Sequence, residues 1–174
     1  MEKYSPIFNV ENEEQLDELV EFIGMAKRST SSNNPDEKFH RSKKRSWPDG
    51  VRRIIFSDGP WDYVDSRDGG NNFDRMVKIY YNKKPVLIMH CEGGLTDEVA
   101  NPFKDEVYIC LRNALRNFDP KEPWRGPEEF NDESGFSYRS KIVRKSKKDF
   151  YIEEEIHEPY GATLYKAICK CSFV

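Results

Sequence analysis

Residues 73–91, FDRMVKIYYNKKPVLIMHC, contain two strand-like runs separated by a short turn, and this stretch decides the fold class. The runs 73–81 and 85–91 are rich in β-branched and aromatic residues, whereas the residues between them are typical of turns. They predict a β-hairpin. Residues on both faces of the second run are apolar, which predicts a strand in the middle of a sheet.

Five further strand-like runs flank this hairpin, two before it and three after it. They cover residues 51–56, 61–67, 136–144, 149–157 and 163–173. Strands joined by tight turns rather than by helices form antiparallel sheets, so we expect about seven strands in one curved antiparallel sheet.

Two segments have helical periodicity. Asn12 and Gln15 form a capping-box pattern before an apolar stripe over residues 16–26. Asn101 and Pro102 predict the start of the second helix, which ends at about residue 117. The order is therefore α-ββββ-α-βββ, an α+β fold with both helices packed on one face of the sheet. The helix-plus-meander unit occurs twice, which raises the hypothesis of an internal duplication.

The composition favours one soluble domain over residues 1–174, because 13% of the residues are aromatic and disordered chains contain few aromatics. No apolar run approaches the roughly 20 residues that cross a bilayer, and no secretory signal is visible. We therefore expect a cytoplasmic protein without membrane contact. Cys91, Cys110, Cys169 and Cys171 show no framework spacing and are interpreted as small buried hydrophobic residues.

Charge is unevenly distributed along the chain. The formal net charge is −3, but residues 38–53 contain seven basic residues and one acidic residue. We expect residues 29–50 to form a flexible basic loop, because serine, asparagine and proline precede the basic stretch. Its candidate contacts for nucleic acid are Lys43, Lys44 and Arg45, and a solvated loop is the alternative.

An ordered set of short motifs extends over most of the chain: GPWDYVDS at 59–66, GG at 69–70, KPV at 84–86, RGP at 125–127 and EE at 153–154. Together they resemble an uncharacterised prokaryotic domain family, often found behind a helix-turn-helix in proteins described as transcriptional regulators and also found alone. The resemblance implies a sensory or effector-binding module without an established activity. No helix-turn-helix pattern precedes the first motif, so direct operator recognition is not expected.

One strand face combines aromatic and charged residues that suit a polar small molecule. Trp61, Tyr63, Asp65 and Arg67 share this face by the two-residue period of a strand, and Tyr80 is a further candidate. The alternative is an Asp–Arg pair at the sheet surface, with the aromatic rings in the core.

Glu154 is expected to point into the core, because it shares a strand face with Phe150, Ile152 and Ile156. A buried carboxylate must be paired, protonated or functional. The functional interpretation makes Glu154 the acid or base of a hydrolase or isomerase, alone or with Glu92. The structural alternative is a bulge or a nearby arginine.

Arg125 lies in a rigid loop that can present a guanidinium group to an anion or bond to backbone carbonyls instead. No cofactor and no metal site are expected, because His and Cys show no ligand spacing. The leading hypothesis is a non-catalytic module that binds a small molecule or a protein partner between the sheet and the helices. The alternatives are the acid–base enzyme and a nucleic-acid accessory protein that uses the basic loop. Nothing in the sequence predicts an oligomeric state or identifies a ligand.

Overall fold

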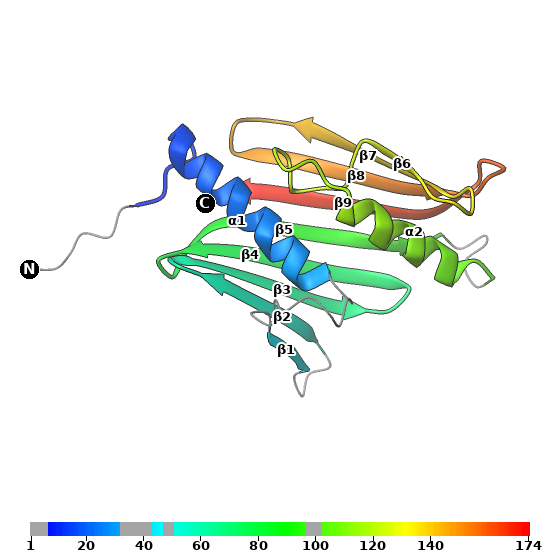
Figure 1. The fold of residues 1–174 in the computed structure, drawn as a ribbon, viewed down its shortest axis with the longest axis horizontal. Coiled ribbons are helices and arrows are strands. Elements are labelled where there is room, and N and C mark those ends of the chain that lie inside the picture. Colours follow the sequence, from blue (N-terminus) through cyan, green and yellow to red (C-terminus); the bar gives the residue numbers. More distant parts are fainter. Residues whose placement is uncertain (1–6, 32–42, 47–50, 97–101) are drawn as a thin grey trace, which may run out of the picture.

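Two helices lie on one face of an antiparallel sheet, which has nine strands in the described residues (Figure 1). The computed structural model describes residues 7–31, 43–46, 51–96 and 102–174, without the side chains of Ser31 and residues 43–46. In chain order the elements are α1 (Glu13–Ser31), β1 (Lys43–Ser46), β2 (Arg52–Asp58), β3 (Trp61–Gly69), β4 (Asn72–Tyr81), β5 (Lys84–Leu95), α2 (Lys104–Arg116), β6 (Glu129–Asn131), β7 (Ser137–Arg144), β8 (Asp149–His157) and β9 (Thr163–Phe173).

The sheet consists of two meanders that meet at its centre. The strand order is β1-β2-β3-β4-β5-β9-β8-β7-β6, and every neighbouring pair is antiparallel. The last strands of the two meanders, β5 and β9, pair with each other, with Leu87 opposite Phe173 and Leu95 opposite Tyr165. Each half is therefore a helix followed by a meander, and this topology is consistent with the duplication hypothesis.

The α+β class, the antiparallel sheet and the two helices on one face are confirmed. The seven predicted strands correspond to β2–β5 and β7–β9, and the two strands that were not predicted are β1, with 4 residues, and β6, with 3 residues. Both lie at the edges of the sheet and are too short to show the alternation of a half-buried strand.

The loop predicted at residues 29–50 is shorter than expected. Helix α1 continues to Ser31, and residues 43–46 pair with β2. Near the end of α1 the Thr30 hydroxyl donates a hydrogen bond to the Lys27 carbonyl at 3.3 Å. Thr30, which the sequence suggested for a turn, therefore bonds to the helix backbone. Residues 32–42 and 47–50 lie outside the described residues, and the flexibility expected there stays a prediction.

The predicted helix starts are confirmed in part. The Asn12 side chain accepts a hydrogen bond from the Gln15 N–H at 3.2 Å, but the Gln15 side chain accepts from the N–H of Asn9, at 2.6 Å, rather than from that of Asn12. The second helix begins at Lys104 after Phe103, and the predicted cap Asn101 lies outside the described residues.

Neither α1 nor α2 is both long and apolar enough to cross a membrane. A cytoplasmic location stays a prediction.

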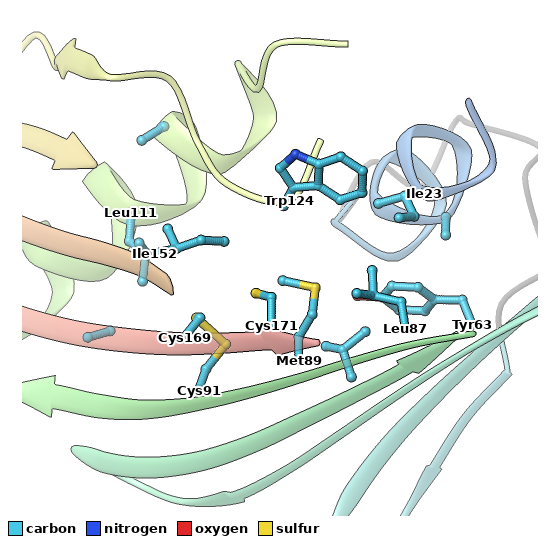
Figure 2. Close-up of a cluster of buried hydrophobic side chains, with 14 of the residues drawn as sticks. Ile23, Tyr63, Leu87, Met89, Cys91, Leu111, Trp124, Ile152, Cys169 and Cys171 are labelled. Atoms are coloured by element: carbon cyan, nitrogen blue, oxygen red, sulfur yellow. A yellow bond between two sulfur atoms is a disulfide. The ribbon is translucent and has the colours of Figure 1, made fainter. Parts of the chain in front are cut away.

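The hydrophobic core fills the layer between the helices and the sheet (Figure 2). Ile23 of α1 and Leu111 of α2 face side chains of the central strands, among them Leu87 and Met89. Each such side chain stabilises the fold by roughly 1.5–3 kcal/mol when it leaves water. Helix α1 contacts β2 and β3, whereas α2 contacts β6, β7 and β8. The first turns of α1 also face the β7–β8 turn of the other half.

A disulfide joins the two halves of the sheet. Cys91 of β5 and Cys169 of β9 are directly opposite each other, with their Cα atoms 3.9 Å apart, and 78 positions separate them in the chain. Cys110 and Cys171 are free and buried. The interpretation of all four cysteines as small buried hydrophobic residues is therefore wrong for Cys91 and Cys169. Their pairing depends on the contact between β5 and β9, which the cysteine spacing does not reveal.

Candidate ligand-binding site

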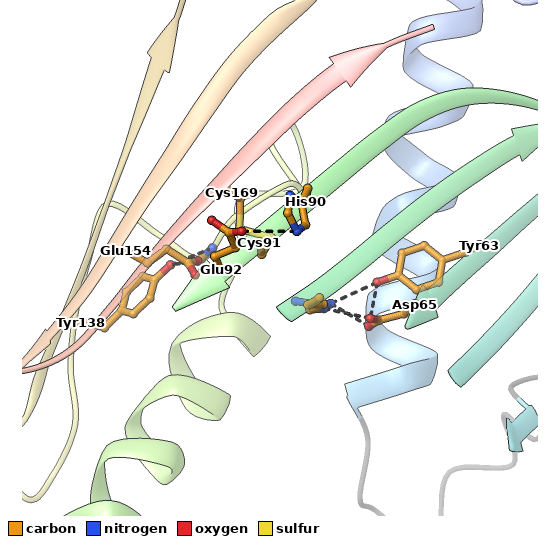
Figure 3. The surroundings of a disulfide bond; sticks show 10 residues. Tyr63, Asp65, His90, Cys91, Glu92, Tyr138, Glu154 and Cys169 are labelled. Carbon is orange, nitrogen blue, oxygen red and sulfur yellow. Dashed lines mark hydrogen bonds and ion pairs between the residues drawn. A yellow bond between two sulfur atoms is a disulfide. The ribbon is translucent and has the colours of Figure 1, made fainter. Parts of the chain in front are cut away.

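Three polar side chains of β3 and β4 form a connected group on the helix-facing side of the sheet (Figure 3). Arg75 donates to both carboxylate oxygens of Asp65, from Nε at 2.9 Å and from Nη2 at 2.8 Å. The same Nη2 donates to the Tyr63 hydroxyl at 3.4 Å. Bidentate pairs of this kind are among the stronger ion pairs. The side chains of Asp65 and Arg75 are 12% and 29% exposed, so solvent only partly screens their attraction.

Glu154 of β8 forms a second polar group in the same layer. Only 8% of Glu154 is exposed, which agrees with the expectation that it points inward. Its Oε1 accepts a hydrogen bond of 2.6 Å from the Tyr138 hydroxyl, which in turn accepts from the Gly126 N–H at 3.3 Å. Burial and the neighbouring Glu154 charge raise the pKa of Tyr138, so the phenol stays protonated and remains a donor.

Lys27, near the end of α1, is within electrostatic reach of both groups. Burial, together with the charge of Arg75, lowers the pKa of Lys27 to about 8, although the carboxylates of Glu154 and Asp65 act in the opposite direction. Its Nζ lies 5.8 Å from the centre of the Phe118 ring. The helix therefore places a lysine where the neutral form of the side chain is favoured more than in water.

Tyr165 of β9 is buried where these groups meet. Burial raises its pKa well above the usual value, and the Glu154 charge raises it further, whereas the charges of Arg75 and Arg67 lower it. Tyr108 of α2 also raises the pKa of Tyr165. The Tyr108 hydroxyl is buried and has no hydrogen-bond partner in the described part of the chain.

We call these residues together the interior polar cluster. Its members are Lys27, Tyr63, Asp65, Arg67, Arg75, Tyr108, Tyr138, Glu154 and Tyr165. The cluster combines cationic groups, carboxylates and phenols, which can bind a polar molecule by charge and by hydrogen bonds.

The sequence identified four members of this cluster, Tyr63, Asp65, Arg67 and Glu154, and missed the others. A signal was present for two of these. Lys27 follows Ile23 by four positions and so continues the apolar stripe of α1, and Arg75 alternates with Phe73 and Val77 on β4. A charged residue at a position expected to be buried is the pattern that should have been sought.

Two predicted binding residues lie elsewhere. Trp61 begins β3 at the opposite end from Arg67 and is 6% exposed, with its ring 4.6 Å from that of Tyr81 and 5.6 Å from that of Phe22. Tyr80 faces away from the helices, because it alternates with inward-facing residues of β4 and lies opposite Asp62. The structure therefore assigns Trp61 to the core and separates both residues from the interior polar cluster.

Arg125 braces the loop between α2 and β6. It donates to the Ser140 hydroxyl at 2.9 Å and forms ion pairs of 3.3 Å with Glu122 and Glu128. The residue is 7% exposed. These partners favour the structural alternative, in which the guanidinium stabilises the loop rather than binding a ligand.

Glu92 lies on the helix-free face of the sheet, opposite Asp74 of β4 (Figure 3). His90 Nε2 is 3.0 Å from Asp74 and 3.8 Å from Glu92, and ligand atoms of all three residues lie within 4.8 Å of one another. An imidazole and two carboxylates are suitable ligands for a divalent cation, a grouping that spacing along the chain did not predict. Because Glu154 faces the helices, the predicted pair of Glu154 and Glu92 is wrong, and these residues cannot act together on one substrate.

Lys43, Lys44 and Arg45 form most of the edge strand β1. Their side chains lie outside the described residues, so their contact with nucleic acid stays a prediction.

Three surface grooves are described. One, of about 850 Å³, lies between α1 and the β7–β8 turn, the second, of about 800 Å³, lies beside Arg125, and the third, of about 580 Å³, lies between α2 and β6. None of these three is lined by a member of the interior polar cluster. The cluster is therefore defined by its buried charges and hydrogen bonds rather than by one of these grooves.

The fold and the cluster define an α+β domain with charged groups between an antiparallel sheet and two helices. The chain belongs to the family described as Domain of unknown function (DUF5680), whose model matches residues 65–173, well over half of the sequence. The match contains Asp65, Arg75 and Glu154 but not Lys27. No curated protein and no solved structure matched the chain. The family description names no activity.

Proposed function

We propose that this protein is a non-catalytic module that binds a small molecule at the interior polar cluster. The observation that supports this function is charge in a layer otherwise filled by apolar side chains. Removing charged groups from water costs free energy unless they are paired, and such groups with shifted pKa values are typical of binding sites.

A sensory role is part of the same proposal. It is supported by the resemblance of the sequence motifs to domains that accompany transcriptional regulators, and a protein partner is the alternative occupant. The acid–base enzyme is not proposed, because Glu92 lies on the other face and Tyr138 donates to Glu154.

Screening followed by mapping tests this function. Native mass spectrometry of the purified full chain should detect a retained small molecule, or a thermal-shift screen of anionic, neutral and cationic metabolites should find compounds that raise Tm. Amide chemical-shift changes caused by the bound compound should centre on β3, β4, α2 and β9 around the interior polar cluster. A screen without any binder, or shift changes confined to another surface, would contradict the proposal.

A further inference from the structure

The helix-free face of β4 and β5 carries a histidine next to two carboxylates, of which His90 and Glu92 are labelled in Figure 3. His90 Nε2 lies 3.0 Å from an Asp74 oxygen and 3.8 Å from a Glu92 oxygen. One nitrogen or oxygen atom from each side chain lies within 4.8 Å of the other two. Bonds from a metal ion to such atoms are about 2.0–2.2 Å long, so small side-chain rotations would bring all three atoms onto one ion.

The backbone of two neighbouring strands holds these three side chains on one face. Asp74 of β4 is directly opposite Glu92 of β5, and His90 precedes Glu92 by two positions, so it points to the same side. Cys91 lies between the two β5 residues and bonds to Cys169 of β9, which ties this part of β5 to its neighbour. All three side chains thus come from strands in the middle of the sheet, and strands position a site more precisely than loops do.

Carboxylates form a row across the sheet at this place. Asp74 lies directly opposite Asp68 of β3 on one side and Glu92 on the other. Like charges directly opposite each other destabilise a sheet. In the described part of the chain, neither Asp74 nor Glu92 forms an ion pair with a lysine or an arginine, although Lys170 of β9 is opposite His90. A bound cation would supply the missing positive charge.

A second histidine on the sheet shows the contrasting arrangement. His157 Nε2 lies 3.2 Å from one Glu155 oxygen, and the other Glu155 oxygen lies 3.3 Å from the ammonium group of Lys166. The lysine balances this carboxylate. At His90 a second carboxylate stands where this lysine would be, so the His90 group has the ligands for a cation and the His157 group already contains one.

We propose that Asp74, His90 and Glu92 bind a divalent transition-metal ion such as Zn²⁺. An imidazole nitrogen combined with carboxylate oxygens suits Zn²⁺ better than Mg²⁺ or Ca²⁺, which favour oxygen ligands alone. The three side chains are between 32% and 62% exposed, so an ion can enter and water can complete its coordination. The site faces away from the helices, is separate from the interior polar cluster and does not depend on the proposed function.

Titration of the untagged full chain with Zn²⁺ tests the site, with Mg²⁺ as the comparison ion. Calorimetry should give a Zn²⁺ affinity at least about a hundredfold higher than that for Mg²⁺. In NMR spectra of the imidazole nitrogens, the Nε2 signal of His90 should shift on binding, whereas the signals of His157 should not. Bound Zn²⁺ should also raise Tm, because the three ligands come together only in the folded chain.

Two variants remove ligands and a third is the matched control. His90→Gln and Asp74→Asn should each weaken Zn²⁺ binding at least about tenfold, because each removes a direct ligand. His157→Gln removes the histidine of the other histidine–carboxylate pair and should leave the affinity unchanged. The pair of His90 and Asp74 is exposed and contributes little to stability, so both ligand variants should stay folded, which circular dichroism checks.

Three results would overturn the metal site. The first is Zn²⁺ binding that His90→Gln and Asp74→Asn leave unchanged, or that shifts the signals of His157 instead. The second is equal affinity for Zn²⁺ and Mg²⁺, which is the behaviour of an acidic surface without ligand preference. The third is no Zn²⁺ binding to the unmodified chain. None of these results bears on the small-molecule proposal, whose test maps binding to the other face of the sheet.

Discussion

The two halves of the sheet follow one plan but stabilise an inward-facing carboxylate in different ways. In the half built from α1 and β1–β5, Asp65 forms a bidentate ion pair with Arg75. In the half built from α2 and β6–β9, Glu154 accepts a hydrogen bond from the neutral phenol of Tyr138. The ion pair of Asp65 adds the positive charge of Arg75 to the layer, whereas the partner of Glu154 adds no charge. The two halves thus share a topology but differ in the polar residues of their interior. The excess positive charge lies with the N-terminal half.

The largest expected effect concerns the bond that joins the halves. Replacing Cys91 and Cys169 by alanine should lower the free energy of unfolding by about 4 kcal/mol, because the disulfide closes a loop of 78 positions in the unfolded chain. Urea denaturation measures this loss. A reducing agent should destabilise the unmodified protein by a similar amount and should not affect the double variant. Equal stability with and without reductant in the unmodified protein would show that the bond does not form.

The next effect compares the two carboxylates. Asp65→Asn removes the partner of Arg75 and should cost about 2–3 kcal/mol, at the low end for a buried ion pair because Arg75 is partly exposed. Glu154→Gln keeps an oxygen that can accept from Tyr138 and should cost about 1 kcal/mol. Denaturant unfolding of both variants and the unmodified protein at pH 7 measures the two losses in free energy of unfolding. The comparison between the halves is wrong if Glu154→Gln is the more destabilising change.

A pH dependence should identify Lys27. Its pKa is about 8 in the folded state against the usual 10.5, so between these values the unfolded chain binds more protons and stability rises with pH through this group. Cys110 and Cys171 act in the opposite direction above pH 9, because burial raises their pKa to about 12. Buried Tyr63 opposes it above pH 10, since its pKa is also raised.

The contribution of Lys27 is therefore read as a difference between two proteins. The stability of the unmodified chain minus that of Lys27→Met should increase from pH 8 to pH 10, as the ammonium penalty disappears. Facing groups on other elements, namely Arg75, Glu154, Asp65 and Cys171, are present in both proteins, so their own titrations largely cancel. Chemical denaturation at each pH gives the values. A flat difference would mean that Lys27 is solvated.

The smallest effect belongs to the helix-free face. His90 and Asp74 are 3.0 Å apart, with side chains 32% and 61% exposed. An exposed pair contributes about 0–1 kcal/mol, so His90→Gln should hardly change the free energy of unfolding. Urea denaturation at pH 6 and pH 8 measures it. A loss comparable to that of Asp65→Asn would show that charge is as strongly coupled on this face as under the helices.

Much of the fold follows from local patterns. The alternation in residues 61–67, 73–81 and 149–157 predicted strands that the structure contains, and the periodicity after Asn12 predicted α1. The short edge strands β1 and β6 were missed, because partner strands rather than their own side chains determine them. The same two-residue period predicted that Glu154 faces the interior, which the structure bears out. For Asp65 the sequence left open a binding face or a pair at the sheet surface, and the structure buries this residue.

The partners of these residues did not follow from the sequence. Asp65 pairs with Arg75 of the neighbouring strand rather than with Arg67 of its own, and only the register of β3 and β4 determines this choice. Lys27 reaches the same layer only because α1 crosses β2 and β3. Trp61 and Tyr80 share the composition of a binding face, yet one lies in an aromatic core and the other on the opposite face.

By itself, then, the sequence determined the α+β class, the order of the main elements and the inward direction of Glu154. These properties depend on neighbours within a few positions, where helix and strand periods act directly. The tertiary structure alone decided that β5 pairs with β9, that Cys91 bonds to Cys169, and that Lys27 of α1 lies within electrostatic reach of Arg75. Such contacts join residues far apart in the chain, and they form only when the two meanders and two helices bury their apolar faces together.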